Sequence, residues 1–412
     1  MSTAHEHREF DIIVWGATGF TGSLVVEYLL RQYGTDNAIR WAIAGRDQSK
    51  LDALTQNIGE PANNLNTIVA DSFDLESLQN MARRTRVMLT TVGPYARFGS
   101  DLVAACVQNG THYCDLAGEV QWIRRMIDEH DEQAAATGAR IVNCCGFDSI
   151  PMDIGVWFLQ DSAKQQHRSY CTSITTLVRA MKGGASGGTI ASMLNVVQES
   201  RADRAIARIL ADPYGLNPAG ERQGPDQRDQ QNARFDSHVK CWTAPFVMAG
   251  INTRVVRRSN ALQGFPYGRD FRYREAVITG AGLAGRIKAT GITLGLAGFV
   301  LAACFKFPRK TMQRLFLPAP GDGPDKASRE AGFFKLLQIG VLPDGTVLRA
   351  NVKGDRDPGY GSTSKMIAEC AVCLALDEPA TGGGVWTPAA ALGRSLYKRL
   401  QANAGLTFEI VD

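Results

Sequence analysis

The chain has 412 residues, of which 44% are hydrophobic and 21% are charged, a composition typical of soluble globular proteins and a length that favours two domains. Its 45 basic and 41 acidic residues give a net charge of +4, which is too balanced to indicate a nucleic-acid partner. The nine cysteines form an odd, irregularly spaced set and the N-terminus does not resemble a signal peptide, so we expect a protein of the reducing cytoplasm.

Residues 10–22 predict a strand, a glycine turn and a helix in immediate succession. Mostly apolar residues lead into Gly16, glycines recur at every third position, and an apolar helical stripe through Leu24 and Leu29 follows. This succession opens dinucleotide-binding folds, in which glycines let the backbone approach a pyrophosphate and the helix N-terminus meets its charge. The spacing is G-x-x-G-x-x-G rather than G-x-G-x-x-G, and a purely structural turn is the alternative. The predicted cofactor-binding residues are Gly16, Ala17, Thr18, Gly19, Phe20, Thr21 and Gly22.

The first half of the chain continues by alternating strands and helices. Further strands are predicted at residues 39–44, 67–70, 87–91, 113–116 and 141–144, with helices between them. Six strands in such alternation predict a parallel sheet covered by helices on both faces, a Rossmann-type doubly wound α/β fold. Ligands of these sheets bind at the carboxyl ends of the strands, so the residues that follow each strand are the site candidates.

The second and third predicted strands end in residues suited to the adenosine half of a cofactor. Arg46 and Lys50 follow the second strand, where cations favour the 2′-phosphate of NADP; solvated surface cations are the alternative. Asp47 comes one residue late for the carboxylate of an NAD site and can cap the next helix. Asp71 and Ser72 end the third strand, where a carboxylate either meets the adenine amino group or caps a helix.

The later strand ends carry the candidates for chemistry. Val92, Gly93 and Pro94 predict a tight turn along the nicotinamide ribose, and we expect Tyr95 to point into the cleft. The fifth and sixth strands run into carboxylates and a serine on glycine-containing turns, which indicates either a reaction site or helix caps. These residues are Asp115, Glu119, Asp148, Ser149 and Asp153. No spacing of His, Cys or Asp indicates a metal site.

After residue 151 the pattern changes and predicts a second domain. Strands are predicted at residues 173–181, 246–256 and 272–278. The Pro-, Gln- and Asp-rich residues 211–233 predict a mobile surface loop. The Gly- and Ser-rich turn at residues 182–189 precedes a helix, and it either holds an anionic group or is a flexible loop.

Residues 289–305 form a run of seventeen uncharged, mostly apolar residues. As a helix this run has a length of about 25 Å, which is short of the roughly 30 Å hydrocarbon core of a bilayer. The sequence leaves open a buried or substrate-covering helix, a helix docked on a membrane surface, and a true membrane span. Cations suited to anionic headgroups flank the run on both sides: Arg286, Lys288, Lys306, Arg309, Lys310 and Arg314.

Seven motifs in order resemble the saccharopine dehydrogenase-like oxidoreductases, and more narrowly the branch of the trans-acting enoyl reductases. They read GATGFTG, AGR, VGPY, HYCDLAGE, CGFDSIP, DPGYGSTSKM and GGVWTPAAA. The resemblance implies NADP(H) and an N-terminal Rossmann domain that includes the returning C-terminal segment. It also implies a second α/β (α+β) domain whose sheet covers the active site. The implied domains are residues 1–150 with 355–412, and residues 151–354.

The resemblance also implies an NADPH-dependent enoyl reductase that acts on an acyl thioester in lipid metabolism. Hydride addition to the β-carbon leaves an enolate that needs hydrogen-bond donors and then a proton. Tyr95 and Asp148 are the candidates for proton delivery or orientation, with Ser149 as an accessory donor. A Tyr-x-x-x-Lys pair is missing near the fifth strand, which counts against a ketoreductase of the short-chain type.

The sequence also allows two other functions. One is a saccharopine-type amino-acid reductase, which reduces an imine and needs arginines for its carboxylates; Arg254, Arg257, Arg258 and Arg272 are available. The other is a non-catalytic NADP-binding scaffold associated with a membrane. The expected partners are a lipid-like or acyl-thioester substrate and a peripheral membrane contact through residues 289–305, and a homodimer is left open.

Overall fold

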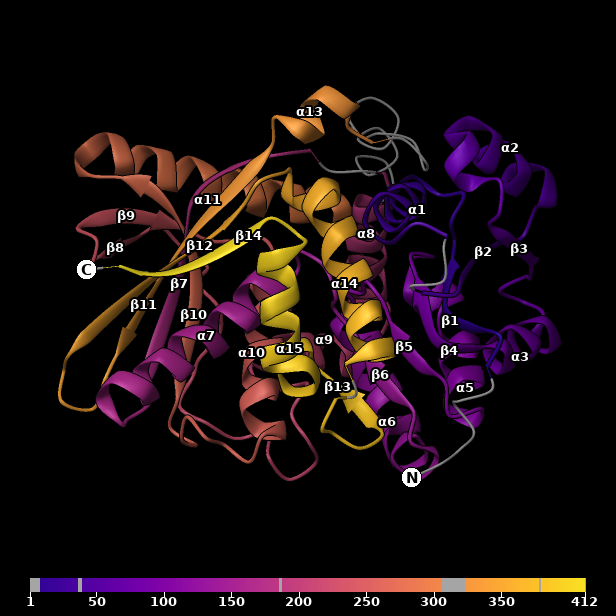
Figure 1. Cartoon of the computed structure of the whole chain (residues 1–412). Helices are drawn as coiled ribbons and strands as arrows, with labels where there is room; N and C mark the ends of the chain where they lie inside the picture. Colours follow the sequence, from indigo (N-terminus) through magenta and orange to yellow (C-terminus); the bar gives the residue numbers. More distant parts are fainter. Residues whose placement is uncertain (1–7, 36–38, 185–186, 306–322, 378, 412) are drawn as a thin grey trace. The chain divides into compact units, whose positions relative to one another are not determined.

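The computed structural model describes residues 8–35, 39–184, 187–305, 323–377 and 379–411 (Figure 1). The chain divides into two compact units. The first consists of Met1–Phe147 with Gly359–Ala404, and the second of Asp148–Pro358 with Gly405–Asp412.

The first unit contains a parallel sheet of seven strands in the order β13-β6-β5-β4-β1-β2-β3. All of its pairings are parallel. Strands β1, β2 and β4 are almost wholly buried, as expected of a sheet with helices on both faces. The strands are β1 (Phe10–Trp15), β2 (Trp41–Gly45), β3 (Asn66–Val69), β4 (Thr85–Thr90), β5 (His112–Cys114), β6 (Arg140–Val142) and β13 (Gly384–Trp386).

The helices of the first unit complete a doubly wound α/β fold, so the predicted fold class is confirmed. They are α1 (Phe20–Tyr33), α2 (Gln48–Ile58), α3 (Leu75–Arg84), α4 (Tyr95–Phe98), α5 (Ser100–Gln108), α6 (Val120–Thr137), α14 (Thr363–Leu376) and α15 (Pro388–Ala402). Helix α14 contacts α1 and α15, and a buried carboxylate joins the three: Glu369 accepts hydrogen bonds from Tyr28, Tyr33 and Asn403. The C-terminal helices are therefore integral to this unit.

The second unit contains a mixed sheet of seven strands in the order β14-β12-β11-β7-β10-β9-β8. Strands β7 and β10 pair in parallel and the other neighbours are antiparallel. The strands are β7 (Ser173–Lys182), β8 (Arg234–Asp236), β9 (Cys241–Ala244), β10 (Arg272–Gly280), β11 (Phe333–Val341), β12 (Val347–Gly354) and β14 (Leu406–Val411).

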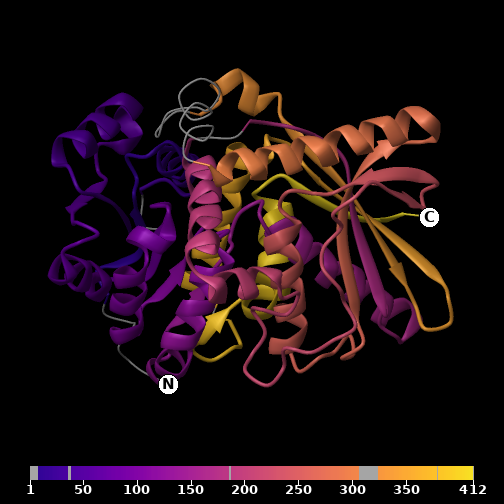
Figure 2. The same cartoon turned by 180° about the vertical axis from the view of Figure 1, so that it is seen from behind.

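The helices of the second unit are α7 (Ile150–His167), α8 (Gly187–Ala202), α9 (Arg204–Ala211), α10 (Ala249–Leu262), α11 (Gly282–Cys304) and α13 (Lys326–Glu330). Helices α7 and α10 contact each other and the strands of the sheet (Figure 1). Figure 2 shows α11 as a long helix that reaches α8 at one end, where Ala303 packs against Leu194.

The strand predicted at residues 246–256 is wrong, because α10 occupies this segment. Nearly every residue of α10 is buried, polar residues included, so the helix lacks the apolar stripe that normally reveals one. Its arginines are buried because residues 212–233 bring carboxylates to them. Arg254 pairs with Asp229 at 2.7 Å and Arg257 pairs with Asp226 at 2.7 Å. The segment predicted as a mobile surface loop thus packs on α10 through ion pairs.

Another difference concerns the C-terminus. The sequence places residues 355–412 together in one domain with the N-terminal sheet, whereas β14 pairs with β12 along Arg349–Gly354 in the sheet of the second unit. Edge pairing of a short terminal strand depends on a partner distant in sequence, and local pattern does not reveal that partner. Elsewhere the chain passes from one unit to the other between Phe147 and Asp148 and between Pro358 and Gly359.

Candidate functional site

The glycine turn after β1 is shaped by close contacts between backbone atoms. Gly16 has a φ of 85°, a conformation that favours glycine. A Cβ atom added at Gly22 would lie 2.0 Å from the carbonyl oxygen of Gly16, so only glycine fits there. Gly19 precedes α1 and offers no side chain to cap it. The first turn of α1 therefore presents backbone N–H groups as a cradle that fits a pyrophosphate.

Residues from two other strand ends lie against this turn. The Thr91 hydroxyl donates a hydrogen bond to the Gly16 carbonyl oxygen at 3.3 Å, and a Cβ at Gly16 would lie 2.6 Å from Val92. At the end of β2, a Cβ at Gly45 would lie 3.7 Å from Thr18. The structure thus brings together three sets of predicted cofactor residues: the glycine turn, the Val92 turn and the residues that follow β2.

The end of β2 presents cations and no free carboxylate. Asp47 caps α2 by accepting a hydrogen bond from the Lys50 backbone N–H at 3.3 Å, which confirms its interpretation as a helix cap. The side chains of Arg46 and Lys50 are exposed, and neither forms an ion pair within the described part of the chain. These two cations suit the 2′-phosphate that distinguishes NADP from NAD.

Asp71, at the end of β3, was interpreted either as a partner of the adenine amino group or as a helix cap, and the structure excludes the helix cap. Asp74, and not Asp71, caps α3, while Asp71 accepts a hydrogen bond from the Phe73 backbone N–H at 2.9 Å and so fixes the turn. Ser72 is half-buried in this turn. Phe73 is 75% exposed and touches Phe98 edge-on at 5.6 Å.

The turn after β4 contains a cis peptide bond between Gly93 and Pro94 and leads into α4. Glu119, which is fully buried, accepts hydrogen bonds from the backbone N–H groups of Tyr95 at 2.8 Å and Ala96 at 3.0 Å. Its carboxylate thereby caps α4 and fixes the turn. The sequence indicated a functional carboxylate at Glu119, which follows β5. It did not reveal that this carboxylate binds backbone N–H groups in the turn after β4.

Tyr95 does not present its hydroxyl to solvent. The hydroxyl donates to the Thr90 carbonyl oxygen at 3.3 Å and accepts from the Leu116 backbone N–H at 3.1 Å. Burial, reinforced by the nearby Asp115 carboxylate, raises the pKa of Tyr95 well above its usual value. The phenol thus ties the end of β4 to the end of β5, and its expected orientation into a cleft is not what the structure shows.

Asp115 plays the same kind of role at the ends of β5 and β6. Its buried carboxylate accepts hydrogen bonds from four groups: Tyr113 Oη at 3.0 Å, Ala117 N at 3.0 Å, Asn143 Nδ2 at 2.8 Å and Cys144 N at 3.0 Å. Burial raises the pKa of Asp115 to about 7 even though these donors favour the charged form. The residue therefore positions two site loops.

Asp148 and Ser149 belong to the second unit, at the start of α7. Asp148 is half-buried, and its removal from water raises the pKa of its carboxyl to about 6. Ser149 is fully buried with a φ of 134°, and its hydroxyl donates to Asn252 Oδ1 at 3.3 Å. Of these two predicted residues, Asp148 is thus the one suited to hold a proton near neutral pH.

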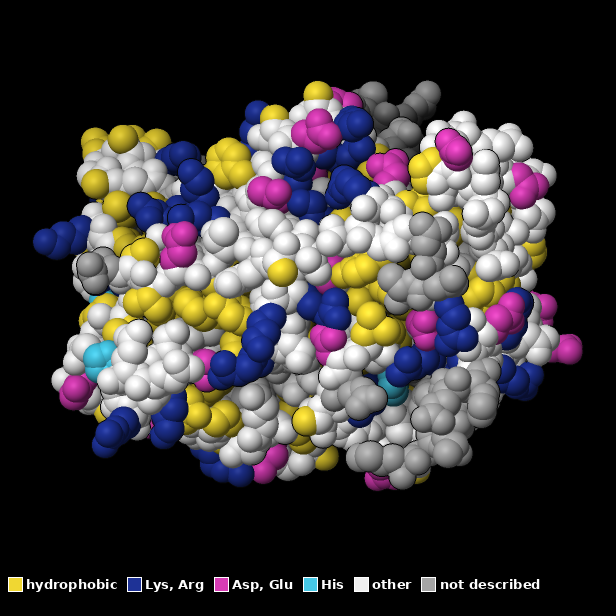
Figure 3. Space-filling view, in the orientation of Figure 1, with side chains coloured by type: hydrophobic (Ala, Val, Ile, Leu, Met, Phe, Trp, Pro, Cys, Tyr) yellow, Lys and Arg dark blue, Asp and Glu magenta, His cyan; other side chains and the backbone are white. Residues whose placement is uncertain are grey.

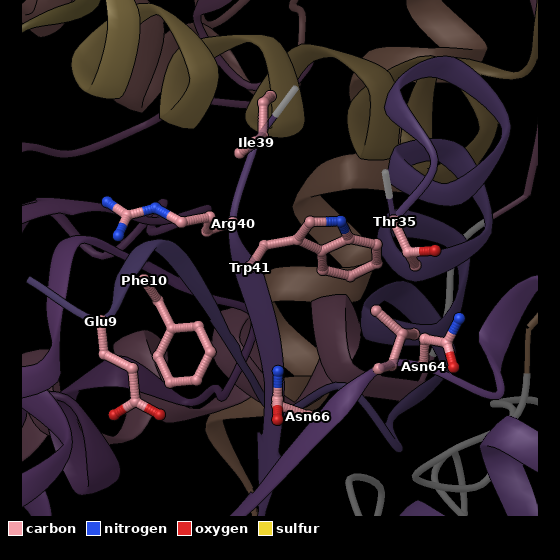
Figure 4. Close-up of a pocket in the computed structure, with 9 residues that line it drawn as sticks. Glu9, Phe10, Thr35, Ile39, Arg40, Trp41, Asn64 and Asn66 are labelled. Atoms are coloured by element: carbon pink, nitrogen blue, oxygen red, sulfur yellow. The ribbon is translucent and has the colours of Figure 1, made fainter. Parts of the chain in front are cut away.

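The described residues contain no group of three or more His, Cys, Asp or Glu side chains arranged to hold a metal ion. A cavity of about 240 Å³ is lined by Phe10, Arg40, Trp41 and Asn66, among others (Figure 4). These residues begin β1, β2 and β3, so the cavity lies at the amino ends of the strands. Because the glycine turn follows the carboxyl end of β1, this cavity belongs to the opposite edge of the sheet.

Comparison with known proteins finds one family model, two relatives and one solved structure that resemble this chain. The family model of the saccharopine dehydrogenase NADP binding domain matches residues 12–142. A putative trans-acting enoyl reductase of Mycobacterium tuberculosis is 43% identical, covering 98% of this chain and 97% of that protein. A trans-acting enoyl reductase of Mycobacterium ulcerans is 37% identical, covering 97% of each chain. Among solved structures, saccharopine dehydrogenase (L-Glu forming) of Saccharomyces cerevisiae shares the fold, with a TM-score of 0.52, 12% identity and coverage of 98% of this chain and 100% of that one.

Proposed function

The chain belongs to the trans-acting enoyl reductase branch of the saccharopine dehydrogenase-like oxidoreductases, and from this membership we propose that it reduces an enoyl thioester with NADPH in lipid metabolism. The observation that carries the proposal is the glycine turn, in which Gly22 lies against Gly16 next to the exposed cations that follow β2. The turn suits the pyrophosphate, and Arg46 with Lys50 suits the 2′-phosphate.

When bound, NADPH supplies the hydride for the β-carbon of the acyl group. The chain then provides a proton for the α-carbon, and Asp148 is our candidate donor because its raised pKa keeps it protonated in mildly acidic solution. Glu119 and Asp115 hold the turns after β4, β5 and β6 in place. Tyr95 acts through the same turns as a positioning residue.

The second unit offers little to the imine-reducing alternative. A substrate with several carboxylates needs unoccupied arginines, and three of the four candidate arginines are buried and bind the protein itself. The fourth, Arg272, is exposed and donates to the Pro225 carbonyl oxygen at 2.9 Å. Arg254 and Arg257 pair with Asp229 and Asp226, and Arg258 donates to the Leu216 carbonyl oxygen at 2.5 Å. Freeing Arg254 or Arg257 for a substrate leaves a largely buried aspartate without its partner, and a buried charge left unpaired costs roughly 3–5 kcal/mol. The acyl substrate makes no such demand.

The direct test is titration with NADPH and with NADH, followed by addition of a long-chain enoyl thioester while the absorbance of the reduced cofactor is recorded. We expect NADPH to bind more tightly than NADH, and oxidation to begin only when the enoyl thioester is present. Tight NADPH binding without turnover on any enoyl thioester contradicts the reductase proposal and favours the non-catalytic scaffold. Turnover with an amino acid and an aldehyde instead favours the imine reductase.

Asp148→Asn tests the proton donor. We expect kcat to fall about 100-fold, because a general acid contributes at least that much, while the Kd for NADPH stays unchanged. In the wild type kcat falls as the pH rises through about 6, since the carboxyl loses its proton there; the variant lacks this step. An unchanged kcat in the variant excludes Asp148 as the donor.

We also propose that the protein is cytoplasmic and docks peripherally on an anionic membrane surface through α11. Within the described part of the chain, this helix is the one that is long and apolar enough to cross a bilayer. An 18-residue stretch of it has a mean hydropathy of 1.7, and 11% of that stretch is buried. Its exposed face carries large apolar side chains, and Figure 3 shows hydrophobic atoms gathered there beside Lys and Arg side chains. The apolar residues are Leu283, Ile287, Leu294, Val300 and Leu301.

Charge complementarity favours a lipid surface as the occupant of this face. Arg286 and Lys288 are exposed on α11, and the sequence continues past the helix with further cations at residues 306–314, which lie outside the described residues. Interfacial helices combine such an apolar face with basic residues that attract anionic headgroups, at about 1 kcal/mol for each cation. A surface helix also suits an enzyme whose substrate is a long acyl chain.

Vesicle sedimentation tests this surface. We expect the protein to sediment with vesicles that contain phosphatidylglycerol but not with pure phosphatidylcholine, and salt to weaken the binding. Ile287→Glu with Leu294→Glu should reduce binding at least tenfold, whereas Leu75→Glu, at an exposed leucine of α3, should not. Binding that is unaffected by the double variant contradicts the proposal. A dimer that the double variant dissociates instead assigns this face to a second copy of the chain.

A further inference from the structure

A buried carboxylate in the second unit collects hydrogen bonds from two directions. Glu275 lies in β10 and is 2% exposed. Its Oε2 accepts a hydrogen bond from Asn252 Nδ2 at 3.0 Å, and its Oε1 accepts one from the Tyr273 hydroxyl at 2.8 Å. The first partner comes from α10 and the second from the same strand, so the carboxylate joins the helix layer to the sheet.

Asn252 and Tyr273 each continue into a longer series of hydrogen bonds. On one side, the Ser149 hydroxyl donates to Asn252 Oδ1 at 3.3 Å. On the other side, the oxygens of Thr176 and Tyr273 lie 2.9 Å apart, and Gln338 Nε2 donates to Thr176 Oγ1 at 3.2 Å. Because Tyr273 gives its one proton to Glu275, the Thr176 hydroxyl donates to Tyr273. All donors in both series therefore point toward Glu275.

This polarity fixes the direction of the Asn252 amide. An ionised carboxylate only accepts hydrogen bonds, so the amide must turn its NH₂ group to Glu275 and its oxygen to Ser149. The Ser149 proton is then committed to Asn252, and the Ser149 oxygen keeps only its lone pairs for any further partner. Asn252, Glu275 and Tyr273 are buried, so water does not compete for the hydrogen bonds among them.

We propose that Glu275 is a positioning residue that sets, through Asn252, whether the Ser149 hydroxyl accepts or donates a hydrogen bond at the acyl substrate. The link to the substrate rests on the proposed function; the link from Glu275 to Ser149 does not. When Glu275 is ionised, Ser149 is an acceptor. When Glu275 is protonated, it donates to Asn252 Oδ1, the amide turns over, its NH₂ group donates to Ser149, and the Ser149 proton is released toward the substrate oxygen.

The groups around Glu275 bring its protonation into the pH range in which the protein can be assayed. Desolvation raises the pKa of Glu275 to about 8, against the opposing effect of the hydrogen bonds from Asn252 and Tyr273. The neighbouring cation, Arg257, is already paired with Asp226, so it leaves the Glu275 charge largely uncompensated. Charged groups around the series on the packed elements are Asp153 on α7, Arg254 and Arg257 on α10, and Asp226 and Asp229 in the preceding loop.

The substitution Glu275→Gln separates the two states. The introduced amide accepts from Tyr273 through its oxygen and donates to Asn252 Oδ1 through its nitrogen, which reproduces the protonated state at every pH. Ser149 is then held as a donor to the oxygen on which negative charge develops. Glu409→Gln is the matched control, because it makes the same change at a half-exposed carboxylate of the same unit, where Glu409 pairs with Lys353 at the surface.

The experiment records kcat for NADPH oxidation by an enoyl thioester between about pH 6 and about pH 10. Because loss of the Asp148 proton already lowers kcat of every variant above about pH 6, each variant is compared with the wild type at the same pH. We expect the ratio of kcat in Glu275→Gln to kcat in the wild type to rise about tenfold through about pH 8, and the same ratio for Glu409→Gln to stay constant. Ser149→Ala should have a lower kcat than the wild type below about pH 8 and should lack the step near pH 8. A ratio of kcat in Glu275→Gln to kcat in the wild type that stays constant through pH 8 overturns the proposal.

A second readout needs no turnover. In protein with labelled asparagine side chains, and with the signal assigned through Asn252→Ala, the Asn252 Nδ2 resonance should shift with a midpoint near pH 8 in the wild type and stay fixed in Glu275→Gln. A shift without any enoyl reduction keeps the Glu275 inference and refutes the proposed function. Enoyl reduction with no Asn252 shift supports the proposed function and refutes the Glu275 inference.

Discussion

Gly22→Ala is expected to abolish measurable NADPH binding, the largest effect of any single change considered for this protein. The added Cβ meets the Gly16 carbonyl oxygen at 2.0 Å and the Ala17 Cα at 2.9 Å, distances that real Cβ atoms do not tolerate. Both contacts are to backbone, so no side-chain rotation relieves them. The turn must open and α1 must move away from β1, which removes the N–H groups aimed at the pyrophosphate.

Isothermal titration with NADPH measures this effect, and a second glycine provides the control. Gly250 lies in α10 with open space around its Cβ position, so Gly250→Ala should leave the Kd unchanged and stabilise the protein by about 0.5–1 kcal/mol. Circular dichroism must show that Gly22→Ala keeps its helix content. A folded Gly22→Ala protein that binds NADPH within about threefold of the wild type contradicts the assignment of this turn to the cofactor.

The cofactor half of the site is predictable from sequence because its determinants are local. A glycine turn needs only the strand before it and the helix after it, so Gly16, Gly19 and Gly22 can be recognised from thirteen consecutive residues. The same holds for Arg46, which directly follows a buried strand. Parallel strands then bring these separate ends to one edge of the sheet, where the structure finds Thr18 next to Gly45 and Thr91 next to Gly16.

The roles of the carboxylates could not be predicted in this way. Glu119 and Asp115 each follow a strand, as site residues do, but their oxygens are used by backbone N–H groups of neighbouring loops. Which N–H group lies opposite a carboxylate depends on the packing of strands distant in sequence. The same reason hides α10, whose buried arginines break the apolar periodicity and become tolerable only once Asp226 and Asp229 are placed beside them.

Arg46→Glu is expected to weaken NADPH binding by 100-fold or more while leaving NADH binding nearly unchanged. A hydrogen bond between a guanidinium and a phosphate is worth about 1.5–3 kcal/mol, or roughly 10–100-fold in Kd. Reversing the charge adds repulsion toward the 2′-phosphate, which brings the loss above that range. NADH has a hydroxyl in place of this phosphate, and a carboxylate at the end of β2 can accept a hydrogen bond from it.

Comparing the two cofactors in one variant makes NADH the internal control for Arg46. If Arg46→Glu disturbed the glycine turn or the fold, both cofactors would lose affinity by the same factor, so equal losses contradict the assignment of Arg46 to the 2′-phosphate. Arg83→Glu, at an exposed arginine of α3 hydrogen-bonded to Asn80, should change neither Kd. Salt offers a further check: the preference for NADPH over NADH should fall as ionic strength rises, because it depends on exposed charges. If the preference for NADPH survives charge reversal at Arg46, another group must bind the 2′-phosphate, because the base and the nicotinamide are common to both cofactors. Lys50, one helical turn further along, is then the side chain to change next.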